Sequence, residues 1–359
     1  TKPILKEMVD EKGNPVVCDQ VWISYFTGGR DNMGEGFGKL TAGYGSRRNP
    51  AEASDKIGPE FTFGIYAQKA LREPVLIIKT AWGGKSIHTD FRPPSAGPYP
   101  FSEKELENLK NRGRNLKEVQ AEKAEQTGRF YRLMIEHVRR VLKDVKRVYP
   151  DYDSEDGYEL AGFAWFQGWN DMVASGTYPN RGQPGGYDAY SECLAHFIRD
   201  VRKDLKAPDM KFVIGVMGVG GPLDKYASQR YVPIHGSFRE AMAAPASMPE
   251  FKGDVMAVRT APFWDARLQR MEDNQGKIKQ MAGFLKSKHK DHPNKDGSMD
   301  AKAQKAHLDK YRKELISAED DAYAKVARSN AAYHYFGSAK TMARIGKAFA
   351  EAMMQMSKK

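Results

Sequence analysis

Short apolar segments alternate with longer amphipathic ones along this sequence, and the alternation limits the folds that the chain can adopt. Each apolar segment ends in glycine, proline or aromatic residues, and its near-continuous apolar character is typical of a strand buried on both faces. Four segments have this character: 74–82, 161–167, 211–221 and 255–265. We therefore predict at least these four strands.

The segments between the strands have the 3.6-residue apolar period of helices that pack one face against a core. They cover residues 58–71, 127–150, 188–208 and 338–356. Strands that alternate with helices in this way favour a parallel sheet with helices on both faces. The sequence therefore predicts a three-layer α/β/α fold with a mostly parallel sheet.

Two charged insertions interrupt this alternation, at residues 101–126 and 268–330. Both are rich in Lys, Glu, Asp and Gln, and neither has enough large apolar residues to form a core of its own. We expect helices that lie at the rim of the site, and we interpret residues 1–359 as a single domain.

The net charge of +11 would suit a nucleic acid or an acidic polymer as partner. However, lysines and acids are mixed in helix-like segments, and in residues 286–321 Tyr311 is the only aromatic residue available for base stacking. We therefore expect no nucleic-acid partner. An anionic polysaccharide would exploit the same positive field, and no apolar run is long enough to span a bilayer.

No metal-binding spacing and no nucleotide-binding fingerprint occurs in the sequence, so we expect neither a metal nor a cofactor. The two cysteines, Cys18 and Cys193, could form a disulfide or remain thiols. Because so small a number is unusual for a disulfide framework, we favour two thiols. The oligomeric state is left open.

Three loops carry residues that could bind a ligand or take part in catalysis. In 80–100, paired glycines directly after a strand would let main-chain amides approach a ligand, although a tight turn explains them equally well. In 167–171, Gln167 and Asn170 have side-chain amides that could stabilise an oxyanion, or they could belong to a capped turn. In 331–346, His334 stands just before the last helix, and a lone histidine is more often structural.

Taken together, these loops resemble the sialate O-acetylesterase and acetylxylan esterase branch of the SGNH hydrolases. The resemblance runs from about Val16 to the end of the chain. Three blocks carry the resemblance: "WGGKSIHTDF" resembles the family's Gly-Gly block, "WFQGWNDM" resembles its W-x-Q-G-E block, and "YHYFGSAKTMARIG" resembles its histidine block. In addition, "GPEFTFG" matches the helix start that precedes the second strand of the family's sheet. The resemblance implies a flavodoxin-like SGNH fold and ester hydrolysis by a serine nucleophile and a histidine base.

The resemblance also implies a role for each matching residue. His334 would be the general base, Gly84 would supply an oxyanion amide and Gln167 would supply a side-chain donor. Asp171 would orient His334, with Asp265, a residue of the second insertion or a main-chain carbonyl as alternatives. The residues that would border the sugar, by contact or by aromatic stacking, are Lys85, Trp169, Asn170, Trp82 and Trp264, with Tyr99 and Phe91 nearby.

The sequence departs from the family pattern in two ways. It has no G-Q-S-N-M block, and "TGGRDNMGEGF" has Asp31 where the nucleophilic serine would fall. We therefore expect the family's first strand and its serine to precede Thr1. Ser86, inside "GGKSIH", is the serine considered there for the nucleophile, although its position suits the continuation of the turn. Trp169 replaces the Q-G-E glutamate, and Ala331 stands where many SGNH enzymes have the triad acid.

These observations predict a carbohydrate esterase that removes O-acetyl groups from a polysaccharide or a sialoglycan. The partner would be an acetylated glycan, with an anionic glycan as one option, and the resemblance implies a secreted or periplasmic protein. The alternative function is a noncatalytic carbohydrate-binding or structural protein that keeps the SGNH frame without its serine.

Overall fold

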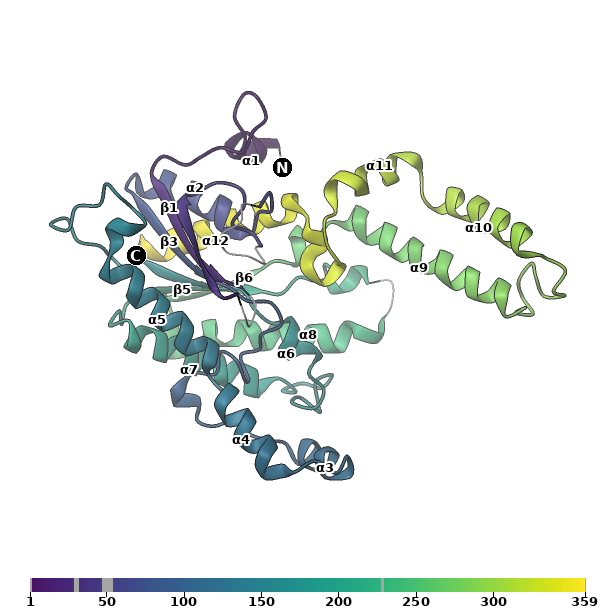
Figure 1. Cartoon of the computed structure of the whole chain (residues 1–359), viewed down its shortest axis with the longest axis horizontal. Helices are drawn as coiled ribbons and strands as arrows, with labels where there is room; N and C mark the ends of the chain where they lie inside the picture. Colours follow the sequence, from purple (N-terminus) through teal and green to yellow (C-terminus); the bar gives the residue numbers. More distant parts are fainter. Residues whose placement is uncertain (1, 29–31, 47–53, 227–228, 359) are drawn as a thin grey trace.

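The computed structural model describes residues 2–28, 32–46, 54–226 and 229–358, and its strands fall into two three-stranded sheets (Figure 1). The first sheet has the order β2-β1-β3, with β1 (Val21–Thr27), β2 (Gly34–Lys39) and β3 (Val75–Thr80). The second has the order β4-β5-β6, with β4 (Gly162–Trp165), β5 (Lys211–Val216) and β6 (Val255–Arg259). Of the described strands, β2 alone pairs antiparallel.

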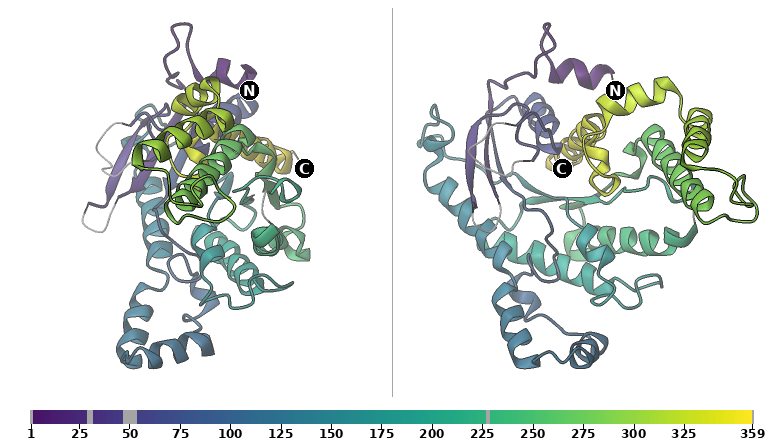
Figure 2. Two further views of the ribbon diagram at one scale, coloured as in Figure 1. Left: turned by 90° about the vertical axis from the view of Figure 1, so that its right-hand side faces the viewer. Right: turned by 45° about the vertical axis from the view of Figure 1, so that its right-hand side comes forward.

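Helices cover both faces of these sheets. On one face, α2 (Pro59–Leu71) packs along α12 (Ala339–Ser357), with α2 against β1 and β3 and α12 against β5 and β6. On the other face lie α5 (Arg129–Lys143), α7 (Asp188–Asp204) and α8 (Val232–Ala243) (Figure 2). The predicted three-layer α/β/α fold with mostly parallel strands is confirmed, except that the described strands form two sheets instead of one.

The strands β3 and β4 are each hydrogen-bonded to a neighbouring described strand on one side only. Helix α5 packs on β3, where Val141 belongs to the apolar cluster that includes Leu76 and Ile78. Although helices cover β3, all six of its residues remain half-buried, whereas β5 is buried from its second residue onward. β3 is therefore less completely covered than β5.

The two charged insertions are helical. The first contains α3 (Glu103–Asn111) and α4 (Leu116–Gln126), and the second contains α9 (Ala266–Lys286), α10 (Ala301–Leu315) and α11 (Ala318–Ala327). In Figure 1 the second insertion extends away from the sheets as an arm, and α3 and α4 lie below α5. The remaining α-helices of the described chain are α1 (Lys2–Met8) and the short α6 (Trp169–Val173).

Cys18 and Cys193 are free thiols, as favoured from the sequence. No described helix is both long and apolar enough to cross a membrane. Within the described residues no group of three or more His, Cys, Asp or Glu side chains could hold a metal ion.

Candidate active site

The paired glycines form an open turn directly after β3. Gly84 has a φ of +73°, which a glycine adopts without strain, and a Cβ added at Gly83 or Gly84 would meet no atom within 4 Å. Both residues are exposed. The main-chain amides of this turn are therefore accessible to a ligand from the carboxyl end of β3.

Asp171 fixes the segment that follows this turn. Its side chain is fully buried, and it accepts hydrogen bonds from the main-chain N–H groups of Ile87 (2.9 Å) and His88 (3.1 Å). Two side chains, Gln167 (2.6 Å) and Tyr178 (3.1 Å), also donate to it. Burial raises the pKa of Asp171 to about 6, although these four donors favour its charged form. Asp171 thus ties α6 to the loop after β3.

Gln167 and Asn170 both donate to the main-chain carbonyl of Lys85, at 2.9 and 3.2 Å. Gln167 donates its other amide hydrogen to Asp171, so both hydrogens of its side-chain amide are engaged. Its Oε1 is buried and has no partner among the described residues. Asn170 makes one described side-chain bond, to Lys85, and its second amide hydrogen has no partner among the described residues. Of the two side-chain donors considered for an oxyanion, Asn170 is the one with a hydrogen to give.

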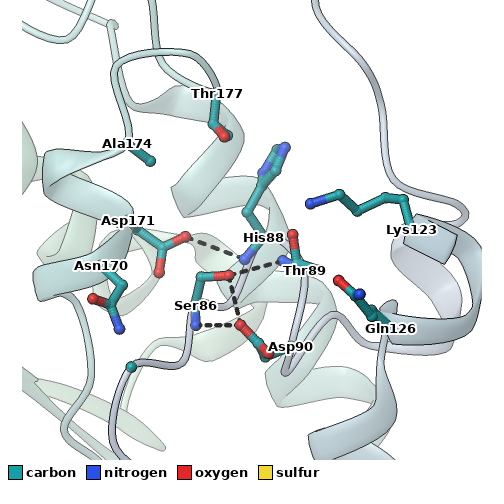
Figure 3. A pocket seen from close by; sticks show the side chains of 11 residues that line it. Ser86, His88, Thr89, Asp90, Lys123, Gln126, Asn170, Asp171, Ala174 and Thr177 are labelled. Carbon is teal, nitrogen blue, oxygen red and sulfur yellow. Dashed lines mark hydrogen bonds between the residues drawn. The ribbon is translucent and has the colours of Figure 1, made fainter. Parts of the chain in front are cut away.

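A polar pocket of about 340 Å³ lies beside this junction (Figure 3). Of the residues singled out from the sequence, Gly84, Asn170, Asp171 and Ser86 line it. The other lining residues are His88, Thr89, Asp90, Lys123, Gln126, Ala174 and Thr177. Neither His88 nor Lys123 was predicted as a site residue from the sequence, where the available signal was the position of His88 four residues after the paired glycines.

His334 does not line this pocket. It lies in a 3₁₀ segment, Ala332–Gly337, where Tyr335 and Phe336 both have positive φ values of 53° and 57°. Two consecutive residues of this size in that conformation are strained, so tertiary contacts must hold them. The buried Tyr335 supplies such contacts, because its hydroxyl lies 2.7 Å from the amide of Gly218 and 2.9 Å from the hydroxyl of Thr260.

Asn330 orients the ring of His334. The Oδ1 atom of Asn330 accepts from the amide of Ala331 at 2.8 Å, which identifies it as the oxygen, and it lies 3.1 Å from Nδ1 of His334. Nδ1 therefore carries the proton and Nε2 keeps a free lone pair. Partial burial lowers the pKa of His334. Both features suit a general base.

The two acids expected to orient His334 have other partners. The described bonds of Asp171 all go to the α6 junction, and Asp265 accepts from Tyr323 at 2.5 Å and pairs with Lys340 at 3.3 Å. Neither is hydrogen-bonded to His334 within the described structure. His334 is instead linked to the α6 segment through its neighbour, since the ring of Tyr333 stacks on that of Trp169 with centroids 5.5 Å apart.

Ser86 has no histidine partner among the described contacts. Its hydroxyl donates to Asp90 at 3.1 Å and accepts from the amide of Thr89 at 3.2 Å, as a turn residue does. Asp31, the other position considered for the nucleophile, lies outside the described residues.

The structure contains a buried serine–histidine pair that the sequence analysis missed, Ser24 and His137. The Ser24 hydroxyl donates to Glu35 at 2.6 Å, so His137 must donate from Nε2, which lies 2.8 Å from the same oxygen. Nδ1 of His137 then accepts from Arg140 at 2.7 Å. A histidine that donates to a serine cannot take its proton, and Ser24 is fully buried. This pair is structural.

Most of the aromatic side chains proposed to stack on sugars pack against other aromatic side chains of the protein. Trp264 is 8% exposed and packs against Tyr335 and Phe336. Trp82 packs on Phe26 and Phe130, at 5.5 and 5.0 Å.

Trp169, which is half-buried, has Tyr333 as its stacking partner. Phe91 and Tyr99 are buried. Lys85 extends over the ring of Phe130 and pairs with Asp90 at 3.5 Å. The packing alternative for these side chains is therefore favoured.

Two solved structures are similar to this chain. One is a protein from Arabidopsis thaliana, 14% identical, with a TM-score of 0.38 over 70% of this chain and 74% of that one. The other is a carbohydrate acetylesterase from Xanthomonas citri, also 14% identical, with a TM-score of 0.37 over 68% of this chain and 43% of that one. Scores this low support no detailed comparison, and no curated protein matches the chain.

A family model gives the stronger result. The model described as a carbohydrate esterase, sialic acid-specific acetylesterase, matches residues 45–234, which is more than half of the 359-residue chain. The matched region includes the Gly-Gly turn, the α6 junction and the whole pocket. The chain therefore belongs to the sialic acid-specific acetylesterase family of carbohydrate esterases.

Proposed function

We propose that this chain forms the greater part of an enzyme that hydrolyses O-acetyl esters on a glycan. The observation that carries the proposal is the position of two donors, the open Gly84 turn and the free amide hydrogen of Asn170, beside one pocket. Donors fixed in advance at such a site offset the negative charge of a tetrahedral intermediate. Asp171 and Gln167 would act as positioning residues that hold these donors in place.

His334 would be the general base. The hydrogen bond between its Nδ1 and Asn330 leaves Nε2 free to take the proton of a nucleophile and to return it to the leaving sugar hydroxyl. In this arrangement the side-chain oxygen of Asn330 takes the place that a carboxylate has in a Ser-His-Asp triad.

The nucleophile would be a serine on a strand that precedes Thr1 in the polypeptide and fits between β3 and β4. Three observations support this placement. First, β3 and β4 have open edges in the described structure, while α12 packs along α2 across the two sheets. Second, the shared carbonyl of Lys85 brings the carboxyl ends of both strands together.

Third, two buried polar atoms lack a described partner where these strands end, Nε1 of Trp82 after β3 and Oε1 of Gln167 after β4. Buried polar groups in folded proteins rarely lack a hydrogen bond. A strand inserted parallel to β3 and β4 would place its last residues beside both atoms and beside Gly84. A residue at the carboxyl end of such a strand lies where ligands bind in open α/β sheets.

The proposal is tested by comparing this chain with a polypeptide extended upstream of Thr1 by its natural sequence. Release of acetate from an acetylated polysaccharide and hydrolysis of 4-nitrophenyl acetate are measured for both. We expect the extended polypeptide to hydrolyse both substrates and the 359-residue chain to be several orders of magnitude slower. If a folded extended polypeptide hydrolyses neither, the esterase function is contradicted.

A second function, glycan binding without hydrolysis, is favoured for the chain by itself, because the hydroxyl of Ser86 is engaged with Asp90 and has no histidine partner among the described residues. In that case the pocket would bind the same sugars and release no acetate. In either case the glycan substrates of carbohydrate esterases suggest that the protein works outside the cytoplasm.

A further inference from the structure

The histidine loop, residues 329–337, follows directly on the last helix of the arm. Helix α11 ends one residue before Arg328, and the loop begins one residue after it (Figure 1). The loop closes on itself, because the amide of Asn330 donates to the carbonyl of Phe336 at 2.9 Å. His334 lies between these two residues, and its Nδ1 atom is 3.1 Å from Oδ1 of Asn330. A group that fixes Asn330 therefore also restrains the ring of His334.

Arg328 makes three contacts at this place. Its Nε donates to the main-chain carbonyl of Asn330 at 3.2 Å, and Nη1 donates to the carboxylate of Glu272 on α9 at 2.6 Å. Its guanidinium carbon lies 5.3 Å from the centre of the ring of Phe336, which is fully buried. One side chain thus joins the first helix of the arm to both ends of the histidine loop.

The backbone of the loop is strained on the far side of His334. Tyr335 and Phe336 have positive φ values, and strained backbone persists only where the surroundings hold it. The hydroxyl of Tyr335 holds the loop to the loops that follow β5 and β6. On the opposite side of His334, Arg328 holds Asn330 to the arm. The base is therefore suspended between the sheet and the arm.

We propose that Arg328 is a positioning residue for the general base. Through its ion pair with Glu272 the arm holds Asn330, and Asn330 holds the proton of His334 on Nδ1. This inference rests on the proposed function, because His334 is assigned there as the base. It gives the second charged insertion a role in the reaction, since α9 carries Glu272 and α11 leads into the loop.

The first test measures where the proton of the neutral His334 ring lies in the 359-residue chain, by nitrogen-15 NMR at a pH where the ring is neutral. Loss of signals in His334→Gln assigns the resonances. In the wild type the proton should lie on Nδ1. In Arg328→Ala it should redistribute toward Nε2, because Oδ1 of Asn330 is no longer held beside Nδ1. A wild-type tautomer in folded Arg328→Ala would overturn the proposal.

Arg267→Ala is the matched control. Arg267 also joins α9 to α11, through Asp320 at 2.7 Å and Glu319 at 3.0 Å, and its side chain is 30% exposed against 29% for Arg328. It makes no described contact with the histidine loop. Arg267→Ala should therefore keep the wild-type tautomer. An equal change in both variants would mean that general attachment of the arm orients the ring, and would contradict a specific role of Arg328.

Glu272→Ala provides a second variant in case Arg328→Ala does not fold. It leaves Arg328 in place without its charged partner on α9, so the tautomer should change in the same direction and by less. An unchanged tautomer in folded Glu272→Ala would show that the arm does not act on His334 through this pair.

Kinetics of the extended polypeptide separate the inference from the proposed function. Arg328→Ala should lower kcat for 4-nitrophenyl acetate by on the order of ten- to a hundredfold with little change in KM, because a base displaced by about 1 Å loses rate on this scale. Arg267→Ala should leave kcat unchanged. A changed tautomer in a polypeptide that hydrolyses no ester would retain the link between the arm and His334 and contradict the esterase. Hydrolysis with equal kcat in the wild type and Arg328→Ala would do the reverse.

Discussion

Gln167 donates a hydrogen bond of 2.9 Å to the main-chain carbonyl of Lys85, and this contact joins the loops that follow β4 and β3. Asn170 donates to the same carbonyl, and Asp171 accepts both from Gln167 and from the loop after β3. The carboxyl ends of two strands that share no hydrogen bonds are thereby held together. The residues that we assign to oxyanion stabilisation all stand on this junction.

Replacement of Asn170 by alanine tests which amide stabilises the oxyanion. Asn170→Ala removes the side chain that has a free hydrogen and should lower kcat of the extended polypeptide by roughly a hundredfold or more, with little change in KM. The measurement is steady-state hydrolysis of 4-nitrophenyl acetate.

Gln167→Ala provides the comparison for Asn170→Ala. Both donors of Gln167 are engaged, so its loss should loosen the Lys85 loop and lower the melting temperature as well as the rate. An Asn170→Ala enzyme with wild-type kcat would contradict the assignment of Asn170.

The general base is tested by His334→Ala, which should cost several orders of magnitude in kcat while the far-UV circular dichroism spectrum is unchanged. His307→Ala is the control, because His307 lies on α10 in the arm and does not line the pocket. If both variants hydrolyse esters equally well, His334 is not the base.

The role of Asn330 predicts a change in pH dependence. Activity should rise with pH as His334 loses its proton, with a midpoint below the ordinary histidine pKa of 6.5, because partial burial favours the neutral ring. Asn330→Asp places a negative charge beside Nδ1, which should raise the pKa of His334 and move the acid limb to higher pH by about one unit. An acid limb at the same pH in both enzymes would show that Asn330 does not contact the base.

The Ser24 and His137 pair is predicted to affect stability and not catalysis. Ser24→Ala leaves Glu35 and His137 each without one buried partner, which should lower the free energy of unfolding by about 1–3 kcal/mol. Ester hydrolysis by the folded fraction should stay at the wild-type rate. Loss of hydrolysis in a folded Ser24→Ala enzyme would mean that this pair belongs to the active site.

Buried neutral histidines should make the protein sensitive to mild acid. Burial lowers the pKa of His137 and of His235 to about 4, below the ordinary value of 6.5. Between these values the unfolded chain binds protons that the folded chain does not, so stability is lost as the pH falls from 6.5 toward 4.

At pH 5 each of these two histidines should cost about 2 kcal/mol, which is 1.36 kcal/mol for each pH unit below 6.5. His235→Gln should therefore show a smaller decrease in unfolding free energy between pH 7 and pH 5 than the wild type, by urea titration at both pH values. An equal decrease in both proteins would contradict the pKa of His235.

The layered fold could be predicted from the sequence because four of its strands are short, nearly continuous apolar segments. Each of β3, β4, β5 and β6 falls within one of the four predicted apolar segments. The first two strands were missed. β1 lies outside the four predicted apolar segments, and β2, with the sequence GEGFGK, has three glycines and no alternating apolar pattern.

The segments that form the site could be predicted from the sequence, but the contacts between their side chains could not. Gly84, Asn170 and Asp171 were singled out and do line one pocket. The partners of Asp171 could not be predicted, because a buried carboxylate and an exposed helix-start aspartate look alike in a sequence. Lys123 belongs to a charged insertion whose helices resemble any solvated helical face, and only tertiary packing brings it to the pocket.

The measurement that tests the account most directly is covalent labelling of the extended polypeptide with a fluorophosphonate, followed by peptide mass spectrometry. The account predicts one labelled serine upstream of Thr1, with labelling lost in His334→Ala, and no labelled serine within residues 1–359. A label on Ser86, Ser24 or any other serine of this chain would contradict the proposed strand between β3 and β4 as the source of the nucleophile.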